Sequence, residues 1–101
     1  MDIELLSKTI RAESEITLNT ADTWDEIYAQ KCALLTESLD ETIAFFDNCT
    51  EEEFVWCSNA FSEISEKFHS QEFIDCLLAC RRRFPHLRDV DDEIRYAARY
   101  V

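Results

Sequence analysis

The chain has 101 residues, enough for one domain with a single hydrophobic core. It contains no glycine and only one proline, which excludes the usual phosphate-cradling loops and dinucleotide fingerprints, because these need glycine where the backbone approaches a ligand. A formal net charge of −12 disfavours nucleic acids and anionic membranes as partners, since both carry the same sign. The composition therefore favours one helical domain over residues 1–101, whose acidity serves either solubility or a cationic partner.

The negative charge is concentrated in the middle of the chain. Between Glu13 and Glu66 there are fourteen acidic residues and a single basic residue, Lys31. From Cys76 to the end, by contrast, six basic residues stand against four acidic ones. A negative field accelerates encounter with a cationic protein, and added salt weakens that effect. We therefore expect the middle of the chain to set the long-range electrostatics.

Targeting signals and cysteine usage favour a cytoplasmic protein. The first ten residues contain early acids and too short an apolar run for a signal peptide. No run approaches the roughly 18 apolar residues that a membrane span requires. The cysteines are odd in number, which favours reduced thiols over a disulfide framework. They are Cys32, Cys49, Cys57, Cys76 and Cys80.

Helical periodicity runs through most of the chain and begins near the N-terminus. A helix over residues 2–12 would place Ile3, Leu6 and Ile10 on one face. Residues 17–23 lack this periodicity and are predicted to be a connecting loop. The first element is therefore a short amphipathic helix followed by a turn.

A long helical stretch is predicted next, over residues 22–48. Ser38 and Glu41 have the spacing of a capping box, so they mark a candidate break into two helices. The apolar side of the stretch would pack on the core and carries Trp24, Ile27, Tyr28, Leu35, Leu39 and Phe46.

Thr50 and Glu53 form a stronger capping box, and the acids at 51–53 suit the positive end of a helix. The helix that they begin carries an apolar stripe with 3-4-3-4 spacing, which is typical of a buried face. The stripe consists of Phe54, Cys57, Phe61, Ile64 and Phe68.

Two further helices complete the pattern. Ser70 is the predicted cap of one, and Pro85 lies just beyond its end, where proline cannot continue a helix. Asp89 is the predicted cap of the last. The expected inward residues are Phe73, Leu77, Cys80 and Phe84 on the first, and Val90, Ile94, Ala97 and Val101 on the second. The chain is therefore predicted to be all-α, with five to six helices in an irregular antiparallel bundle or a short HEAT-like stack.

No arrangement of residues indicates catalysis, a metal or a cofactor. Cys76 and Cys80 stand at i and i+4 after His69, but a structural zinc site needs about four ligands, usually with tighter cysteine pairs on turns. No nucleophile turn accompanies a cysteine and a histidine, and nothing marks a carboxylate as desolvated. We expect no enzyme activity, no metal and no cofactor.

The outward helix faces supply the candidate binding residues. Opposite the phenylalanine stripe, one strip would surround an aromatic anchor with carboxylates, a common composition for a protein interface. An alternative places Trp56 beneath a neighbouring helix, with the acids merely solvated. A second strip on the preceding stretch reads Glu26, Ala33, Glu37, Asp40, Ala44 and Asp47. The candidate partner-binding residues are Glu37, Asp40, Asp47, Glu52, Trp56, Asn59, Glu63 and Glu66.

The segment from residue 51 to residue 85, EEEFVWCSNAFSEISEKFHSQEFIDCLLACRRRFP, resembles the central region of small helical immunity proteins. These proteins accompany bacterial polymorphic toxins, including contact-dependent growth-inhibition systems. The similar elements cover about a third of the chain, and the two ends match nothing in the family. The residues that carry the resemblance are Glu53-Phe54, the stretch 62–67, the stretch 70–74 and Arg83-Phe84-Pro85.

The resemblance implies a cytoplasmic protein that binds and neutralises a cognate toxin domain, commonly a basic nuclease of the RNase type. Toxin-contact residues differ among members of the family, so none is carried over to this chain. We expect a free monomer that meets its toxin through the acidic strips. Two other hypotheses stay open: an acidic adaptor or homo-oligomeric interaction module, and a DNA mimic that binds DNA-binding proteins.

Overall fold

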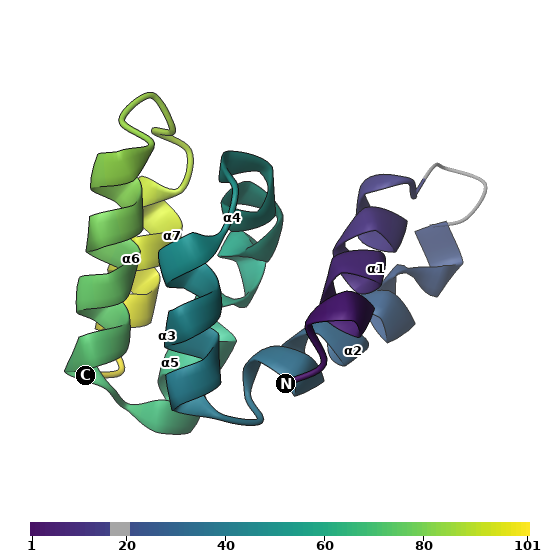
Figure 1. Ribbon diagram of the computed structural model, residues 1–101, viewed down its shortest axis with the longest axis horizontal. Coiled ribbons are helices and arrows are strands. Elements are labelled where there is room, and N and C mark those ends of the chain that lie inside the picture. Colours follow the sequence, from purple (N-terminus) through teal and green to yellow (C-terminus); the bar gives the residue numbers. More distant parts are fainter. Residues whose placement is uncertain (17–20) are drawn as a thin grey trace.

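The computed structural model describes residues 1–16 and 21–101 of the chain. Within them the chain forms helices and no strand, which confirms the all-α prediction. The first two helices, α1 (Ile3–Ser14) and α2 (Trp24–Leu35), form an antiparallel hairpin (Figure 1). Part of the loop predicted at 17–23 lies outside the described residues. The other elements are η1 (Ala21–Thr23), α3 (Leu39–Asn48), α4 (Glu51–Cys57), η2 (Ser58–Ala60), α5 (Phe61–Phe68), α6 (Gln71–Arg83) and α7 (Asp91–Ala98).

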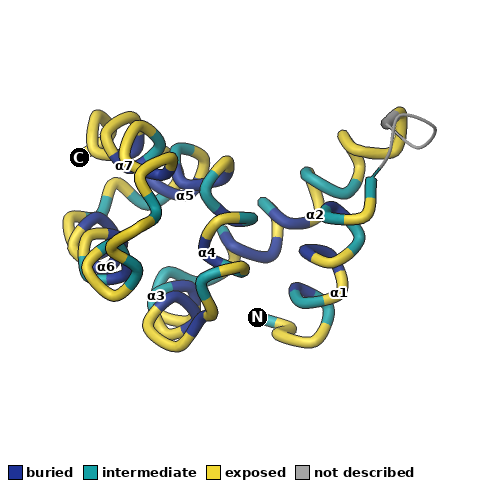
Figure 2. The backbone as a smooth tube through the Cα atoms, turned by 90° about the horizontal axis from the view of Figure 1, so that it is seen from above, coloured by how far each residue is buried: buried dark blue, intermediate teal, exposed yellow. Residues whose placement is uncertain are grey.

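The hairpin and the remaining helices occupy opposite ends of the molecule. The view from above shows α1 and α2 at one end, α6 and α7 at the other, and α4 and α5 between them (Figure 2). α1 packs on α4 and α2 packs on α5, while α6 contacts both α3 and α7. If α4, η2 and α5 are counted as one interrupted helix and the short η1 is left out, the described residues contain six helices, within the predicted range of five to six.

An aromatic cluster fills the centre of the core. The ring of Phe46 lies 5.2–6.2 Å from four other phenylalanine rings, three of them at steep edge-on angles. Such edge-to-face contacts add to the stabilisation from apolar burial. The predicted stripe on α4 and α5 is buried at all positions except Phe68, which is partly buried.

Side-chain caps begin most of the later helices, as the sequence predicts. The hydroxyl of Ser38 accepts from the backbone N–H of Glu41, and this cap separates α3 from α2. Thr50 and Glu53 form a complete capping box, with reciprocal bonds of 2.9 and 3.1 Å. Ser70 caps α6 in the same manner. Caps rather than glycine turns therefore delimit the helices of this glycine-free chain.

One helix end uses a left-handed residue that is not glycine. His69 follows α5 with φ 48° and ψ 46°, the conformation in which glycine usually ends a helix. Its Nδ1 lies 2.7 Å from the carbonyl oxygen of Tyr100. This tertiary hydrogen bond helps to offset the cost of a positive φ in a residue with a Cβ atom.

Four predictions at or near the helix ends are wrong. Ile3 was expected on one face with the buried Leu6 and Ile10 but is 50% exposed, and Trp24, expected on the core side of its helix, is 36% exposed. Val101 was expected to face inward but is 51% exposed at the end of the chain. Asp89 does not cap α7. The N-cap position falls on Val90, which is buried and makes no side-chain cap bond, and three acids in the first turn stabilise the helix instead.

We expect Thr50→Ala to lower the free energy of unfolding by about 1 kcal/mol, because it removes the side-chain acceptor at the start of α4. Chemical denaturation followed by far-UV circular dichroism measures the loss. The matched variant Glu53→Gln preserves the capping-box pattern and should lose less. An equal loss in both variants would contradict a role for the Thr50 hydroxyl.

Candidate functional site

A buried polar cluster joins the α1–α2 hairpin to α4 and η2. The ammonium group of Lys31 is fully buried and donates to three acceptors: Oε1 of Glu13 at 2.5 Å, Oδ1 of Asn59 at 2.5 Å and the carbonyl oxygen of Trp56 at 2.6 Å. The Nδ2 of Asn59 donates in turn to Oε2 of Glu13 at 3.5 Å. The Lys31 Nζ also lies 5.4 Å from the ring centroid of Tyr28. Each N–H of the ammonium therefore has a partner, which offsets much of the desolvation cost.

Glu13 and Lys31 are not among the site residues predicted from the sequence, although a signal was present. Glu13 follows Leu6 and Ile10 at helical spacing, and Lys31 stands four residues before Leu35, so both charges fall on the inward faces of their helices. Opposite charges at inward positions of consecutive helices indicate a buried pair. We call Glu13, Lys31 and Asn59 the buried triad.

Burial of Lys31 changes the surface charge of the acidic middle. It is the only cation between residues 13 and 66, and Glu13 neutralises it inside the protein. The thirteen other carboxylates of that segment remain without a lysine or arginine from the same segment to offset them. Among its described residues, the surface that this segment contributes therefore carries no lysine or arginine of its own.

Two of the predicted partner-binding residues meet in one groove between α2 and α5. Glu63 and Glu66 are exposed on α5 and line a surface groove of about 510 Å³. Lys67 is the only cation among the groove's lining residues in the described part of the chain. The other lining residues are Ala29, Cys32, Ala33 and Thr36. We call this feature the α2–α5 groove.

Titratable groups beside the α2–α5 groove stay neutral. Burial, a hydrogen bond with Cys32 and the nearby Glu63 carboxylate raise the pKa of the Tyr28 phenol. Burial also raises the pKa of the Cys32 thiol. The phenol donates to the backbone carbonyl of Asn59 at 2.9 Å. Near neutral pH, the charge at the groove therefore comes from Glu63, Glu66 and Lys67.

The other predicted acids lie elsewhere. Glu37 and Asp40 are exposed on either side of the break between α2 and α3. Asp47 lies in the last turn of α3, where its carboxylate accepts from the Cys76 thiol at 3.6 Å. Glu52 is exposed in the first turn of α4, and with Arg11 it lines a different groove, between α1 and α4. The eight predicted residues therefore do not share one groove.

The continuous strips assumed in the prediction are also interrupted. The cap at Ser38 ends the long helical stretch, so Glu37 and Asp47 do not lie on the face of one helix. The 3₁₀ segment η2 separates Trp56 on α4 from Glu63 on α5. A 3₁₀ turn has about 3.0 residues per turn rather than 3.6, which changes the direction of the side chains that follow.

Trp56 and Asn59 serve the interior more than the sequence suggested. The Trp56 indole is partly buried and packs against the core, so the expectation that it stands away from the core is wrong. Asn59 is exposed as a residue, but its side-chain amide bonds both members of the Lys31–Glu13 pair. α1 and α2 lie on the side of η2 that the periodicity of a single helix predicted to face solvent.

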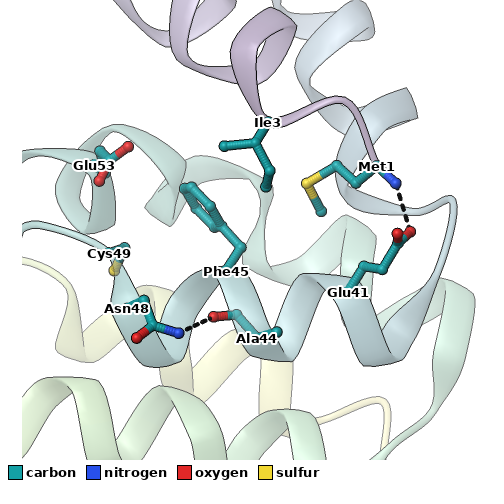
Figure 3. Close-up of a pocket in the computed structure, with 8 residues that line it drawn as sticks. All are labelled: Met1, Ile3, Glu41, Ala44, Phe45, Asn48, Cys49 and Glu53. Carbon is teal, nitrogen blue, oxygen red and sulfur yellow. Dashed lines mark hydrogen bonds and ion pairs between the residues drawn. The ribbon is translucent and has the colours of Figure 1, made fainter.

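A second concavity, mostly apolar, lies at the N-terminus. Ile3 and Phe45 face one another across it, and the Met1 amine pairs with the Glu41 carboxylate at its edge (Figure 3). Its volume is about 390 Å³. Cys49 and Glu53 line the opposite end. None of the predicted binding residues lines this concavity.

The five cysteines are free thiols, as expected. Burial raises the pKa of the Cys57 thiol to about 12, so it is unreactive near neutral pH. Cys76 and Cys80 donate to backbone carbonyl oxygens of α3. Among residues 1–16 and 21–101, no group of three or more histidine, cysteine or acidic side chains is placed to hold a metal ion.

Comparison with known proteins adds no assignment. The chain matches no protein-family model, no curated protein and no solved structure. Among the described helices, none is both long and apolar enough to cross a bilayer. Fold and geometry therefore define the class: an all-α protein with an anionic surface and a buried ionic triad.

Proposed function

We propose that this protein is a cytoplasmic immunity protein, which binds a cationic toxin domain of the RNase type through its acidic surface and blocks access to the nucleic acid. The observation that supports this most is the burial of Lys31 against Glu13. It leaves the surface of the acidic middle segment without a cation of its own. An RNase-type toxin is itself cationic where it binds its polyanionic substrate, so the two surfaces are complementary.

The α2–α5 groove is the proposed centre of the contact. Glu63 and Glu66 present carboxylates beside a concave surface, and a protruding arginine or lysine side chain of the toxin fits both the shape and the charge. Glu37, Asp40 and Glu52 lie outside the groove and contribute mainly to the long-range field. Trp56 is part of the scaffold behind the contact rather than its exposed anchor.

The direct experiment mixes the purified protein with a toxin domain encoded by a neighbouring gene, which the resemblance to immunity proteins implies. We expect a stable one-to-one complex, loss of the toxin's ribonuclease activity and an association rate that falls as salt rises. Absence of a complex at low salt would exclude the proposal. Equal binding to many unrelated basic proteins would instead favour the DNA-mimic hypothesis.

Replacing both groove carboxylates, Glu63→Gln with Glu66→Gln, should slow association with the toxin by about tenfold, because local carboxylates steer the encounter. Stopped-flow fluorescence at low salt measures the rate. A control pair, Glu72→Gln with Asp89→Asn, removes the same charge from exposed positions away from the groove. If both pairs slow association equally, net charge and not the groove governs binding.

A homo-oligomeric adaptor is the second candidate, and one observation favours it. An apolar groove between α6 and α7 is lined by Ile74, Ile94 and Ala98, and Leu78 beside them is 41% exposed. Analytical ultracentrifugation distinguishes the candidates. A dimer that persists in high salt supports the adaptor, whereas a monomer supports the immunity protein.

A further inference from the structure

The buried triad contains the three groups needed to form an amide bond between side chains. Lys31 supplies an amine, Asn59 supplies a carboxamide and Glu13 supplies a carboxylate that touches both nitrogen atoms. The proposed inhibition of a toxin uses the burial of the Lys31–Glu13 pair, but it uses no reaction among the three groups. Their contacts therefore call for an explanation of their own.

Proximity favours reaction between the amine and the amide. The Lys31 Nζ donates a hydrogen bond of 2.5 Å to the Asn59 Oδ1, which holds the nitrogen beside the amide whose carbon is the electrophile. Three helical elements fix these positions: α1 holds the carboxylate, α2 the amine and η2 the amide. Holding two reactants side by side removes the entropy cost of a bimolecular encounter, and well-oriented intramolecular reactions reach effective molarities of roughly 10⁵–10⁸ M.

Glu13 is placed as the acid–base group. Its Oε1 lies 2.5 Å from the Lys31 nitrogen, and its Oε2 lies 3.5 Å from the Asn59 Nδ2, the atom that would depart. One carboxylate can therefore take a proton from the nucleophile and give it to the leaving group. The Glu13 side chain is 1% exposed and that of Lys31 is 0% exposed, so water does not compete for this proton.

We propose that the buried triad forms an intramolecular isopeptide bond between Lys31 and Asn59, with Glu13 as the catalytic acid–base residue. The ammonium of Lys31 passes a proton to Glu13, and the neutral amine attacks the Asn59 side-chain carbonyl carbon to form the C–N bond. The bond from that carbon to Nδ2 then breaks as Glu13 returns the proton to Nδ2. Ammonia leaves and takes up the second proton from the former ammonium, so one ammonium ion is released and Glu13 is again a carboxylate.

The reaction consumes no oxidant, reductant or cofactor. Its product leaves readily, because Asn59 is exposed as a residue although its amide contacts the buried pair. The new bond would close a covalent ring over residues 31–59, joining α2 to η2 across α3 and α4. It would fix the hairpin to the rest of the molecule independently of any toxin.

The test is the mass of the purified full-length chain after prolonged incubation at neutral pH. Denaturing mass spectrometry should give a value below the sequence mass of 11.9 kDa by one ammonia molecule. Proteolysis should yield a branched peptide that joins Lys31 to residue 59. A chain that keeps its full sequence mass throughout incubation overturns the proposal.

Two variants distinguish formation of this bond from other reactions that release ammonia. Lys31→Arg and Glu13→Gln should both retain the full mass, whereas the surface control Lys67→Arg should lose ammonia like the original chain. Succinimide formation at an asparagine gives the same mass change, but it does not need Lys31 and yields no branched peptide. Loss of ammonia in Lys31→Arg, or a digest without the branched peptide, therefore overturns the assignment, and circular dichroism verifies that each variant is folded.

Discussion

In the chain before any Lys31–Asn59 bond has formed, replacing Lys31 with alanine is expected to lower the free energy of unfolding by about 3–5 kcal/mol, because it leaves the Glu13 carboxylate buried without its cation. The carboxylate side chain is only 1% exposed in the folded protein. The substitution also leaves the Trp56 carbonyl and the Asn59 amide oxygen without their donor. A stability of 5–15 kcal/mol is typical of a domain, so a loss of about this size removes a large part of it.

Urea denaturation at constant pH measures this loss, and two comparisons identify its cause. Lys67→Ala removes an exposed lysine and should change stability by no more than about 0.5 kcal/mol. The double variant Lys31→Met with Glu13→Gln leaves no buried charge and should be more stable than Lys31→Ala. If Lys31→Ala unfolds with the same midpoint as Lys67→Ala, the buried pair does not hold the hairpin in place.

Local signals predicted the helices well, because caps and apolar stripes are written in neighbouring residues. Thr50 and Glu53 lie three positions apart, and their reciprocal hydrogen bonds do not depend on how the rest of the chain folds. The stripe from Phe54 to Ile64 is buried because its spacing matches the helical repeat. Such features need no knowledge of which helices meet.

The candidate site was harder to predict because it depends on tertiary pairing. Periodicity indicates that Glu13 and Lys31 face inward, but not that α1 and α2 bring them to the same point. The same limit explains Trp56: its helix face is outward only if nothing packs there, and the hairpin approaches α4 on that side. Non-local contacts of this kind leave no trace in a window of one helix.

The prediction of continuous acidic strips was wrong for a different reason, because the helices that carry them are interrupted. The serine cap at position 38 was visible in the sequence as a candidate break, and the structure uses it. The 3₁₀ segment at 58–60 contains no glycine or proline that would indicate it in the sequence. A strip drawn over an unbroken helix therefore joined Trp56 to Glu63 across a change of helical geometry. What survives is the pair Glu63 and Glu66, which lies entirely on α5.

The largest effect in the aromatic core is expected at Phe46, where alanine should cost about 3–5 kcal/mol of unfolding free energy. The Phe46 side chain is fully buried, and its ring contacts those of Phe45, Phe54, Phe61 and Phe73, so truncation leaves a cavity that helices on several sides would have to fill. At roughly 4–8 °C per kcal/mol, the melting temperature should fall by well over 10 °C.

The matched comparison for Phe46 is Phe84→Ala. Phe84 is only partly buried, and the one ring contact assigned to it within the core is with Phe54 at 5.9 Å, so its truncation removes fewer packing partners. Thermal unfolding followed by circular dichroism should therefore place Phe84→Ala between the original chain and Phe46→Ala. Phe46→Leu keeps more of the buried volume and should also fall between them. If Phe46→Ala and Phe84→Ala melt at the same temperature, the number of ring contacts does not determine the loss of stability. The aromatic core is then not organised around Phe46.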